Sequence, residues 1–134
     1  MIKKEKRTAG APNILLVEPD AFLADIYEKN LVMEDFRVAK AGSGERALDL
    51  LKTKQFDLVL LSVILPKING FETLEAIKKD RKTAAIPVVL LTKLGAREDV
   101  EKSRALGADG YIIKTHFQPS EVVDKIKQIL FHKK

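Results

Sequence analysis

The chain has 134 residues, of which 46% are hydrophobic and 32% are charged, and it contains no cysteine. This composition is typical of one ordinary globular domain, and it excludes both a disulfide framework and a thiolate site. No apolar run is long enough to cross a bilayer, and the basic N-terminus lacks the apolar stretch of a signal peptide. We therefore expect a cytoplasmic protein that makes no membrane contact.

The net charge of +5 lies at the two ends of the chain. Residues 1–10 contribute +3 and the last two lysines contribute +2, so the body between them is neutral. Nucleic-acid-binding domains usually gather Lys and Arg on one folded face. We therefore expect a folded domain over residues 12–131 between mobile tails of residues 1–11 and 132–134. We expect no nucleic-acid binding except through these basic tails.

Apolar runs rich in β-branched residues predict five strands, over residues 13–17, 36–40, 57–61, 87–91 and 111–114. The segments between and after them have helical periodicity. Apolar stripes on the second, third and fifth helical segments contain Ala47, Leu48 and Leu51, then Phe71, Leu74 and Ile77, then Val122, Ile126 and Ile129. Strands that alternate with helices predict βαβ units. We therefore expect an α/β fold, with a five-stranded parallel sheet, helices on both faces and a flavodoxin-like arrangement.

The first helix has a stripe with one polar interruption, formed by Phe22, Ile26, Asn30 and Met33. Residues with special backbone preferences mark the helix ends. Ser43 can cap the second helix, and Asn69-Gly70 gives a tight turn into the third. Gly107 can end the fourth helix, and Pro119 suits the first turn of the fifth.

Polar residues follow four of the predicted strands. They are Glu18 and Asp20 after the first strand, with Pro19 between them, Ser62 after the third, Thr92 and Lys93 after the fourth, and Lys114 and Thr115 after the fifth. Because the carboxyl ends of parallel strands share one edge of the sheet, these residues should converge there. An acid, two hydroxyls and an ammonium group around a crevice are typical of a phosphate or metal site.

Four segments mark the strand ends and their loops, ILLVEPDAFL (14–23), DLVLLSVILPKINGFE (57–72), PVVLLT (87–92) and ALGADGYIIK (105–114). In this order and spacing, they resemble the receiver domains of bacterial two-component response regulators. The resemblance runs from about residue 13 to residue 131. It implies a signalling module, not an enzyme, in which an acidic pair and an aspartate after the third strand hold Mg²⁺. It also implies that this aspartate accepts a phosphoryl group from a histidine kinase.

The resemblance assigns roles to four retained residues. Glu18 matches the first acid of the pair, Thr92 the hydroxyl after the fourth strand, and Lys114 the lysine after the fifth. Tyr111 matches the switch aromatic. In the family, the hydroxyl and the lysine engage the phosphoryl oxygens, and the hydroxyl and the aromatic couple the pocket to the surface.

Two positions depart from the family pattern. Pro19 stands where the second, metal-binding acid belongs, and Ser62 stands where the phosphoacceptor aspartate belongs. A serine is un-ionised at neutral pH, and Mg²⁺ commonly needs one or two carboxylates as well as phosphate. Asp57 lies about 16 Å down the third strand, and we expect Asp20 to cap the first helix. With Glu18 alone remaining, we expect no acyl phosphate, no metal site, and Mg²⁺ binding that is lost or very weak.

The predicted function is a phosphorylation-independent pseudo-receiver that signals or scaffolds through protein contacts. The resemblance implies that the fourth helix, fifth strand and fifth helix, roughly residues 96–131, face a protein partner or a second copy. We also hypothesise a permanent pair of Glu18 and Lys114, with Thr92 and Ser62 as hydrogen-bond partners, that holds the pocket closed without a ligand. The chain ends soon after the fifth helix, so we expect no output domain within it.

Three alternatives remain open at this point. One is a small-ligand or anion sensor that uses the vacated pocket at Lys114 and Thr92, and another is a nucleic-acid module that acts through the tails. An engineered serine at the phosphoacceptor position is the third, although the neighbouring proline argues against a single deliberate substitution. Thr115 replaces the usual proline after the lysine, so we expect a trans peptide there. His116 and His132 are isolated and do not indicate a metal cluster.

Overall fold

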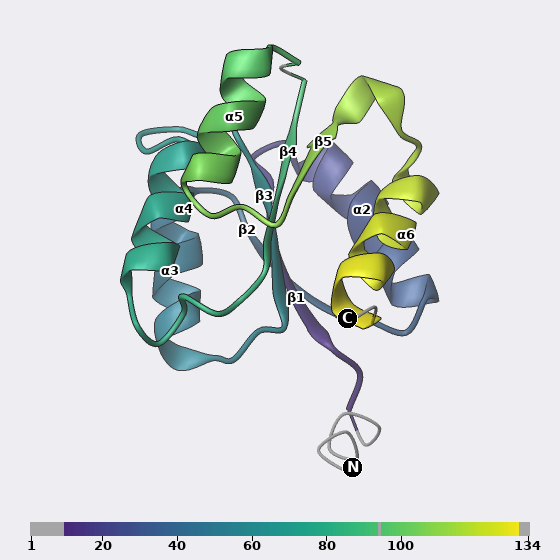
Figure 1. The fold of residues 1–134 in the computed structure, drawn as a ribbon. Coiled ribbons are helices and arrows are strands. Elements are labelled where there is room, and N and C mark those ends of the chain that lie inside the picture. The colour runs from purple at the N-terminus through teal and green to yellow at the C-terminus, as the bar shows by residue number, and fades with distance from the viewer. Residues whose placement is uncertain (1–9, 94, 132–134) are drawn as a thin grey trace.

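Five parallel strands form one sheet between two layers of helices in the computed structural model, which describes residues 10–93 and 95–131 (Figure 1). The elements, in chain order, are β1 (Asn13–Val17), α2 (Ala21–Met33), β2 (Arg37–Ala41), α3 (Gly44–Thr53), β3 (Leu58–Ser62), α4 (Gly70–Lys79), β4 (Val88–Thr92), α5 (Arg97–Ala105), β5 (Gly110–Ile113), the 3₁₀ turn η1 (Lys114–His116) and α6 (Pro119–Phe131). The predicted mobile tails fall mostly on residues 1–9 and 132–134, which lie outside the described residues.

The strand order is β2-β1-β3-β4-β5, with every neighbouring pair parallel. Helices α2 and α6 cover one face of the sheet, and α3, α4 and α5 cover the other (Figure 1). This is the doubly wound, flavodoxin-like fold predicted from the sequence. The chain reverses direction across the sheet between β1 and β3, and such a reversal leaves a crevice at the carboxyl ends of the strands.

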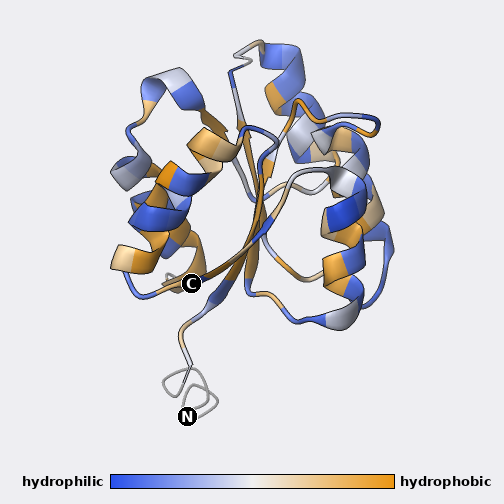
Figure 2. Cartoon of the chain, turned by 180° about the vertical axis from the view of Figure 1, so that it is seen from behind, coloured by the Kyte–Doolittle hydropathy of each residue, from blue (hydrophilic) through white to orange (hydrophobic). Residues whose placement is uncertain are grey.

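The core consists of two apolar clusters, one on each face of the sheet, as the hydropathy colouring of Figure 2 shows along the central strands. Strands β3 and β4 are buried at every position. Their side chains alternate between the faces, so that Leu61 packs toward α3 and α4 while Leu60 packs toward α2 and α6. Each fully buried leucine contributes roughly 1.5–3 kcal/mol to stability. The near-continuous apolar sequence of these strands reflects burial on both faces.

The stripe predicted for the first helix is wrong. Helix α2 buries Ala24, Tyr27 and Leu31, whereas Phe22 and Met33 are each 75% exposed. The inward face is rotated by about one position, so that a small alanine and the ring of a tyrosine pack against the sheet in place of the predicted residues. The stripes predicted for α3, α4 and α6 are confirmed. Among the described helices, none has the length and apolarity that a membrane span requires.

The predicted helix ends are confirmed. The Ser43 hydroxyl accepts the N–H of the third residue of α3, and Asn69 forms a reciprocal capping box with Glu72 at the start of α4. A side-chain cap of this kind contributes about 1 kcal/mol. Gly107, just beyond α5, has a φ of 98°, and Pro119 is the first residue of α6. These residues therefore set the lengths of the helices that surround the crevice.

Gly70 begins α4 at its closest approach to β3. Its N–H donates to the Val63 carbonyl oxygen at 2.7 Å, and a Cβ here would lie 2.4 Å from the carbonyl oxygen of Ser62. We expect Gly70→Ala to lower the free energy of unfolding by about 2–3 kcal/mol, measured by urea denaturation, because the added methyl group pushes α4 off the strand. Gly42→Ala is the control, since a Cβ there meets nothing within 4 Å. Similar effects of both substitutions would contradict the close approach.

Candidate functional site

Three polar side chains converge at the carboxyl edge of the sheet, on the face that α2 and α6 cover. Glu18 directly follows β1, Ser62 ends β3, and Lys114 directly follows β5. The core residues two positions earlier in each strand, all on that face, are Leu16, Leu60 and Ile112. Because side chains alternate along a strand, the three polar residues point to the same side. The fold alone therefore brings together residues that are 44 and 96 positions apart.

The carboxylate of Glu18 is the centre of this site. Its Oε1 accepts a hydrogen bond from the Ser62 hydroxyl at 2.5 Å and another from the Lys114 ammonium at 3.0 Å. Its Oε2 accepts the backbone N–H of Asp20 at 3.2 Å. The side chains of Glu18 and Lys114 are only 3% and 15% exposed. The hypothesised pair is therefore present, with Ser62 as one of its hydrogen-bond partners.

A pocket of about 200 Å³ opens beside this pair. Besides Glu18 and Lys114, its lining residues are Pro19, Asp20, Leu23, Ile64, Leu91, Thr92 and Lys93. Thr92 is 2% exposed, and the alternation along β4 directs its side chain to the other face of the sheet, so it contributes little to the open surface of the pocket. Pro19 contributes an apolar ring to this lining. The pocket therefore combines apolar residues with two acids, Glu18 and Asp20, and two lysines, Lys93 and Lys114.

Sequence reasoning did not identify Leu23 and Ile64 as pocket residues. Ile64 is 62% exposed and stands two positions after Ser62, at the start of the β3–α4 loop. The sequence analysis gave this residue no role, because it simply continues the apolar run of the strand. The signal that could have revealed it is its position just beyond a strand end, where parallel sheets form their crevices.

Asp20 and Asp57, the other two acids considered for this site, are engaged elsewhere. Asp20 caps α2, as expected, with Oδ1 accepting the N–H groups of Phe22 at 3.0 Å and Leu23 at 3.2 Å. Asp57 lies at the opposite end of β3, where its Oδ2 accepts the N–H of Asn13 at 2.7 Å. Within residues 10–93 and 95–131, no three His, Asp or Glu side chains are placed to hold a metal ion.

The residues at the crevice do not fit Mg²⁺. This ion takes six oxygen ligands in near-octahedral geometry and commonly uses one or two carboxylates. Here the single carboxylate, Glu18, is already neutralised by Lys114, and Ser62 offers only a hydroxyl that donates its proton to that carboxylate. A metal ion would have to displace the ammonium group and would gain no second charged ligand.

Thr92 and Tyr111 lie on the other face of the sheet edge. The register pairs Thr92 with Ile113 and Leu90 with Tyr111, so the hydroxyl and the ring belong to the same side. Tyr111 is half-buried and packs against the apolar cluster on the face that α3, α4 and α5 cover. This burial raises the pKa of its phenol, and Asp99 adds a smaller contribution in the same direction. The coupling role expected of this pair stays a prediction.

The described residues contain no cis peptide bond, so the Lys114–Thr115 peptide is trans, as expected. The chain turns here through η1, Lys114–His116, before it enters α6. This turn starts directly at the lysine, so the ammonium group extends over the ends of β1 and β3 from the neighbouring loop.

The comparisons with known proteins agree with this fold. The family model of the response regulator receiver domain matches residues 14–127. The transcriptional regulatory protein CpxR of Escherichia coli is 43% identical over 117 residues, which cover 87% of this chain and 48% of that protein. The chain therefore belongs to the response regulator receiver domain family. It spans about half the length of the curated relatives that it matches.

Solved receiver structures superpose closely on this chain. A CheY-like receiver domain protein from Methanospirillum hungatei is 29% identical, with a TM-score of 0.83 over 90% of this chain and 94% of the other. The Mn²⁺-bound form of response regulator Rcp1 is 27% identical, with a TM-score of 0.81 over 92% of this chain and 97% of the other. The chain therefore has the backbone fold of these receiver structures.

Proposed function

We propose that this receiver domain is a pseudo-receiver that works without phosphorylation and signals through protein contacts. The observation that carries the proposal is the closed group at the crevice, in which Glu18 is bonded to both Ser62 and Lys114. An acceptor carboxylate is absent at position 62, and Pro19 removes a metal ligand. Both changes oppose the same reaction.

The chemistry of phosphoryl transfer explains why these changes are decisive. Formation of an acyl phosphate needs an ionised oxygen nucleophile, with a metal ion to neutralise the phosphoryl oxygens. The hydroxyl of Ser62 is 2.5 Å from a carboxylate that an ammonium group already neutralises. It is also buried, as only 2% of the residue is exposed. We propose that the Glu18–Lys114 pair takes the place of the metal and phosphate, and holds the domain in one state.

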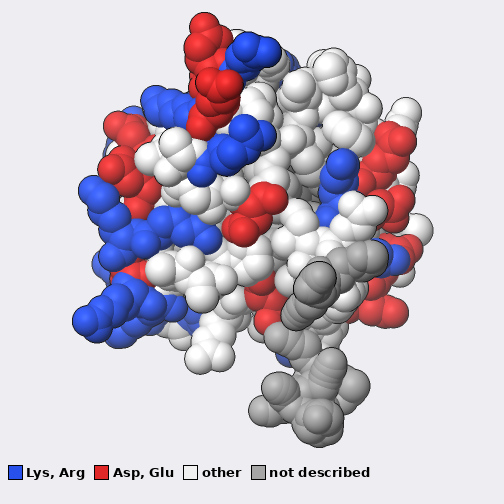
Figure 3. Space-filling view, in the orientation of Figure 1, with Lys and Arg blue, Asp and Glu red and all other residues white. Residues whose placement is uncertain are grey.

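The surface of α5, β5 and α6, within residues 96–131, is the proposed contact face. The half-buried Tyr111 and Ile113 lie on β5, the last strand of the sheet, next to α5. Acidic and basic side chains are mixed over α5 (Figure 3), and the exposed positions of α6 also carry both signs. An apolar centre with a charged rim is typical of protein–protein interfaces. We propose a protein partner or a second copy there, for a domain bounded at about residues 12 and 131.

NMR of the ¹⁵N-labelled chain with Mg²⁺, beryllium and fluoride, which together mimic an acyl phosphate, tests the proposal. We expect no saturable shifts at the amides that follow β1, β3, β4 and β5, because the mimic needs both the missing carboxylate and the missing metal ligand. The receiver domain of CpxR, treated identically, is the comparison. Saturable shifts at these strand ends, with Thr92 and Tyr111 among the affected residues, would contradict phosphorylation independence.

The pocket beside the pair supports a second candidate, a sensor of small anions. Its volume of about 200 Å³ suits a small ligand. Lys93 and Lys114 are the groups that would contact an anion, against the two acids, Glu18 and Asp20, that also line the pocket. A thermal-shift series with phosphate, sulfate and nucleotides tests it. A ligand-dependent rise in the melting temperature that Lys93→Gln reduces would support the sensor, and a flat response throughout would exclude it.

A further inference from the structure

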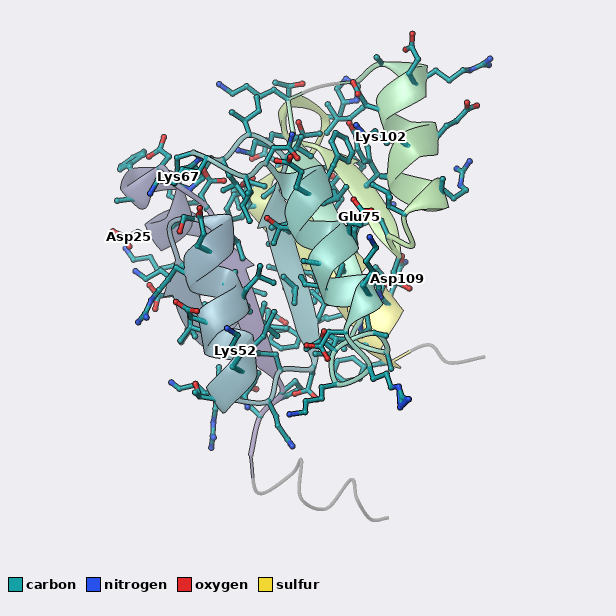
Figure 4. All side chains as sticks on the ribbon, turned by 90° about the vertical axis from the view of Figure 1, so that its left-hand side faces the viewer. Asp25, Lys52, Lys67, Glu75, Lys102 and Asp109 are labelled. Carbon is teal, nitrogen blue, oxygen red and sulfur yellow. The ribbon has the colours of Figure 1, made fainter. Side chains whose placement is uncertain are left out.

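A second cavity, of about 380 Å³, lies at the opposite, amino edge of the sheet. It is formed by the start of β1, the edge strand β2 and the loop between α3 and β3, and its lining residues are Asn13, Arg37, Val38, Ala39, Lys54, Gln55 and Phe56. The C-terminal turn of α3, which Lys52 marks in Figure 4, borders this region. Strand β1 separates it from the Glu18 site by about 16 Å. The two sites are therefore independent.

Two cationic side chains line this cavity. Arg37 begins β2, and its guanidinium group lies beside Gly10, where a Cβ would be 3.4 Å from Nη2. Lys54 stands at the C-terminal cap of α3, where its backbone N–H donates to the Leu50 carbonyl oxygen at 3.0 Å. The acid of the same loop, Asp57, does not line the cavity. The lining therefore carries two positive charges and no negative one.

The rest of the lining is apolar with a few polar groups. Phe56 is 8% exposed and Ala39 is half-buried, and both belong to the apolar cluster on the α3 side of the sheet, so these two residues form an apolar floor. The Asn13 amide donates to the Gln55 carbonyl oxygen at 3.4 Å, which places polar atoms at the rim. Small-molecule sites typically combine an apolar lining with a small number of convergent polar groups, in cavities of about 300–1,000 Å³.

The backbone of β2 adds a further donor. The N–H of Arg37 donates to the Pro12 carbonyl oxygen, on the side of β1. Because the groups of a parallel ladder alternate, the N–H of Val38 points the other way, to the open side of this edge strand. A planar guanidinium, an ammonium and a backbone N–H are the groups that proteins use to bind phosphate oxygens.

We propose that this cavity binds a small organic phosphate of about the size of a mononucleotide. The phosphate lies between Arg37 and Lys54, and the ring or chain of the ligand lies on the apolar floor at Phe56. Such a ligand would reach β2 and α3, and not the crevice of the Glu18 site. The site is therefore distinct from the proposed pseudo-receiver function and does not depend on it.

NMR titration of the full ¹⁵N-labelled chain with AMP, adenosine and inorganic phosphate tests the proposal. We expect saturable shifts with AMP at residues 13, 37–39 and 54–56, weaker ones with phosphate, and none with adenosine at equal concentration. Adenosine binding as tightly as AMP would overturn the assignment to a phosphate. Phosphate binding as tightly as AMP would overturn the role of the floor, and an absence of saturable shifts would overturn the site itself.

Paired variants separate local binding from general attraction to a positive surface. Arg37→Gln and Lys54→Gln should each weaken AMP binding by about tenfold, in keeping with the loss of one charge-assisted hydrogen bond. Lys40→Gln is the control, because Lys40 lies on the same strand but is held by Asp25 and Glu28 at 2.8 Å. Unchanged spectra away from the cavity verify the fold. Equal weakening by all three variants would contradict a specific site.

Discussion

Replacing Lys114 by methionine is expected to lower the free energy of unfolding by about 3 kcal/mol, the lower end of the range for breaking a buried ion pair. The substitution leaves the carboxylate of Glu18, whose side chain is 3% exposed, without its cation. Methionine approximates the length of the lysine side chain, so little packing is lost. We expect a loss of stability at the lower end of this range because the Lys114 side chain is still 15% exposed to solvent. Urea denaturation at neutral pH measures it.

The partner substitution shows whether the pair itself is responsible. The double variant Glu18→Gln/Lys114→Met should be more stable than Lys114→Met alone, because the neutral amide oxygen still accepts from the Ser62 hydroxyl without leaving a buried charge. Lys40→Met is the matched control, since its pair with Asp25 and Glu28 is exposed and is worth at most about 1 kcal/mol. If Lys114→Met destabilised the domain no more than Lys40→Met, the pair would not hold the pocket closed.

The fold was predictable because its signals are local and repeated. Strands β3 and β4 are apolar at almost every position, and only a sheet covered on both faces buries such strands completely. Helix starts were equally clear where a side chain caps the backbone, as at Ser43 and Asn69. The face of α2 was not predictable, because Tyr27 and Ala24 are buried at 3% and 5% exposure while Phe22 is open to solvent. Burial there depends on the fit to α6 and the sheet, which no local pattern contains.

The sequence predicted which residues form the site better than it predicted how they are arranged. Their positions at the ends of strands predicted that Glu18, Ser62 and Lys114 meet at one edge of the sheet. The replacement of two expected acids by Pro19 and Ser62 predicted the direct pair of Glu18 and Lys114. Alternation along β4 and β5 places Thr92 and Tyr111 on the other face, and that separation required the register of the strands. The cavity at Arg37 was not anticipated, because its residues come from three segments and carry no motif.

Restoring the acids should rebuild the metal site only when both are present. Ser62→Asp puts a second carboxylate beside Glu18, at a position where the present hydroxyl is 2.5 Å from its Oε1. The repulsion between the two carboxylates should destabilise this single variant, and Lys114 can offset only one of them. Without an acid in place of Pro19, Mg²⁺ would still lack a ligand of the kind it needs. We therefore expect only weak Mg²⁺ binding by the single variant.

The double variant Pro19→Asp/Ser62→Asp should bind Mg²⁺ at least about tenfold more tightly than either single variant, because three carboxylates then surround one ammonium group. An aspartate at position 19 also lies just before α2, where negative charge is favourable. Calorimetric titration measures the affinities, and the melting temperature of the double variant should rise with Mg²⁺ while that of the unaltered chain stays constant. If Ser62→Asp alone bound as tightly as the double variant, Pro19 would not be part of the lost site. If Mg²⁺ raised the melting temperature of the unaltered chain, the Glu18–Lys114 pair would not exclude the metal. The ion would then displace Lys114 and find enough ligands without either introduced aspartate.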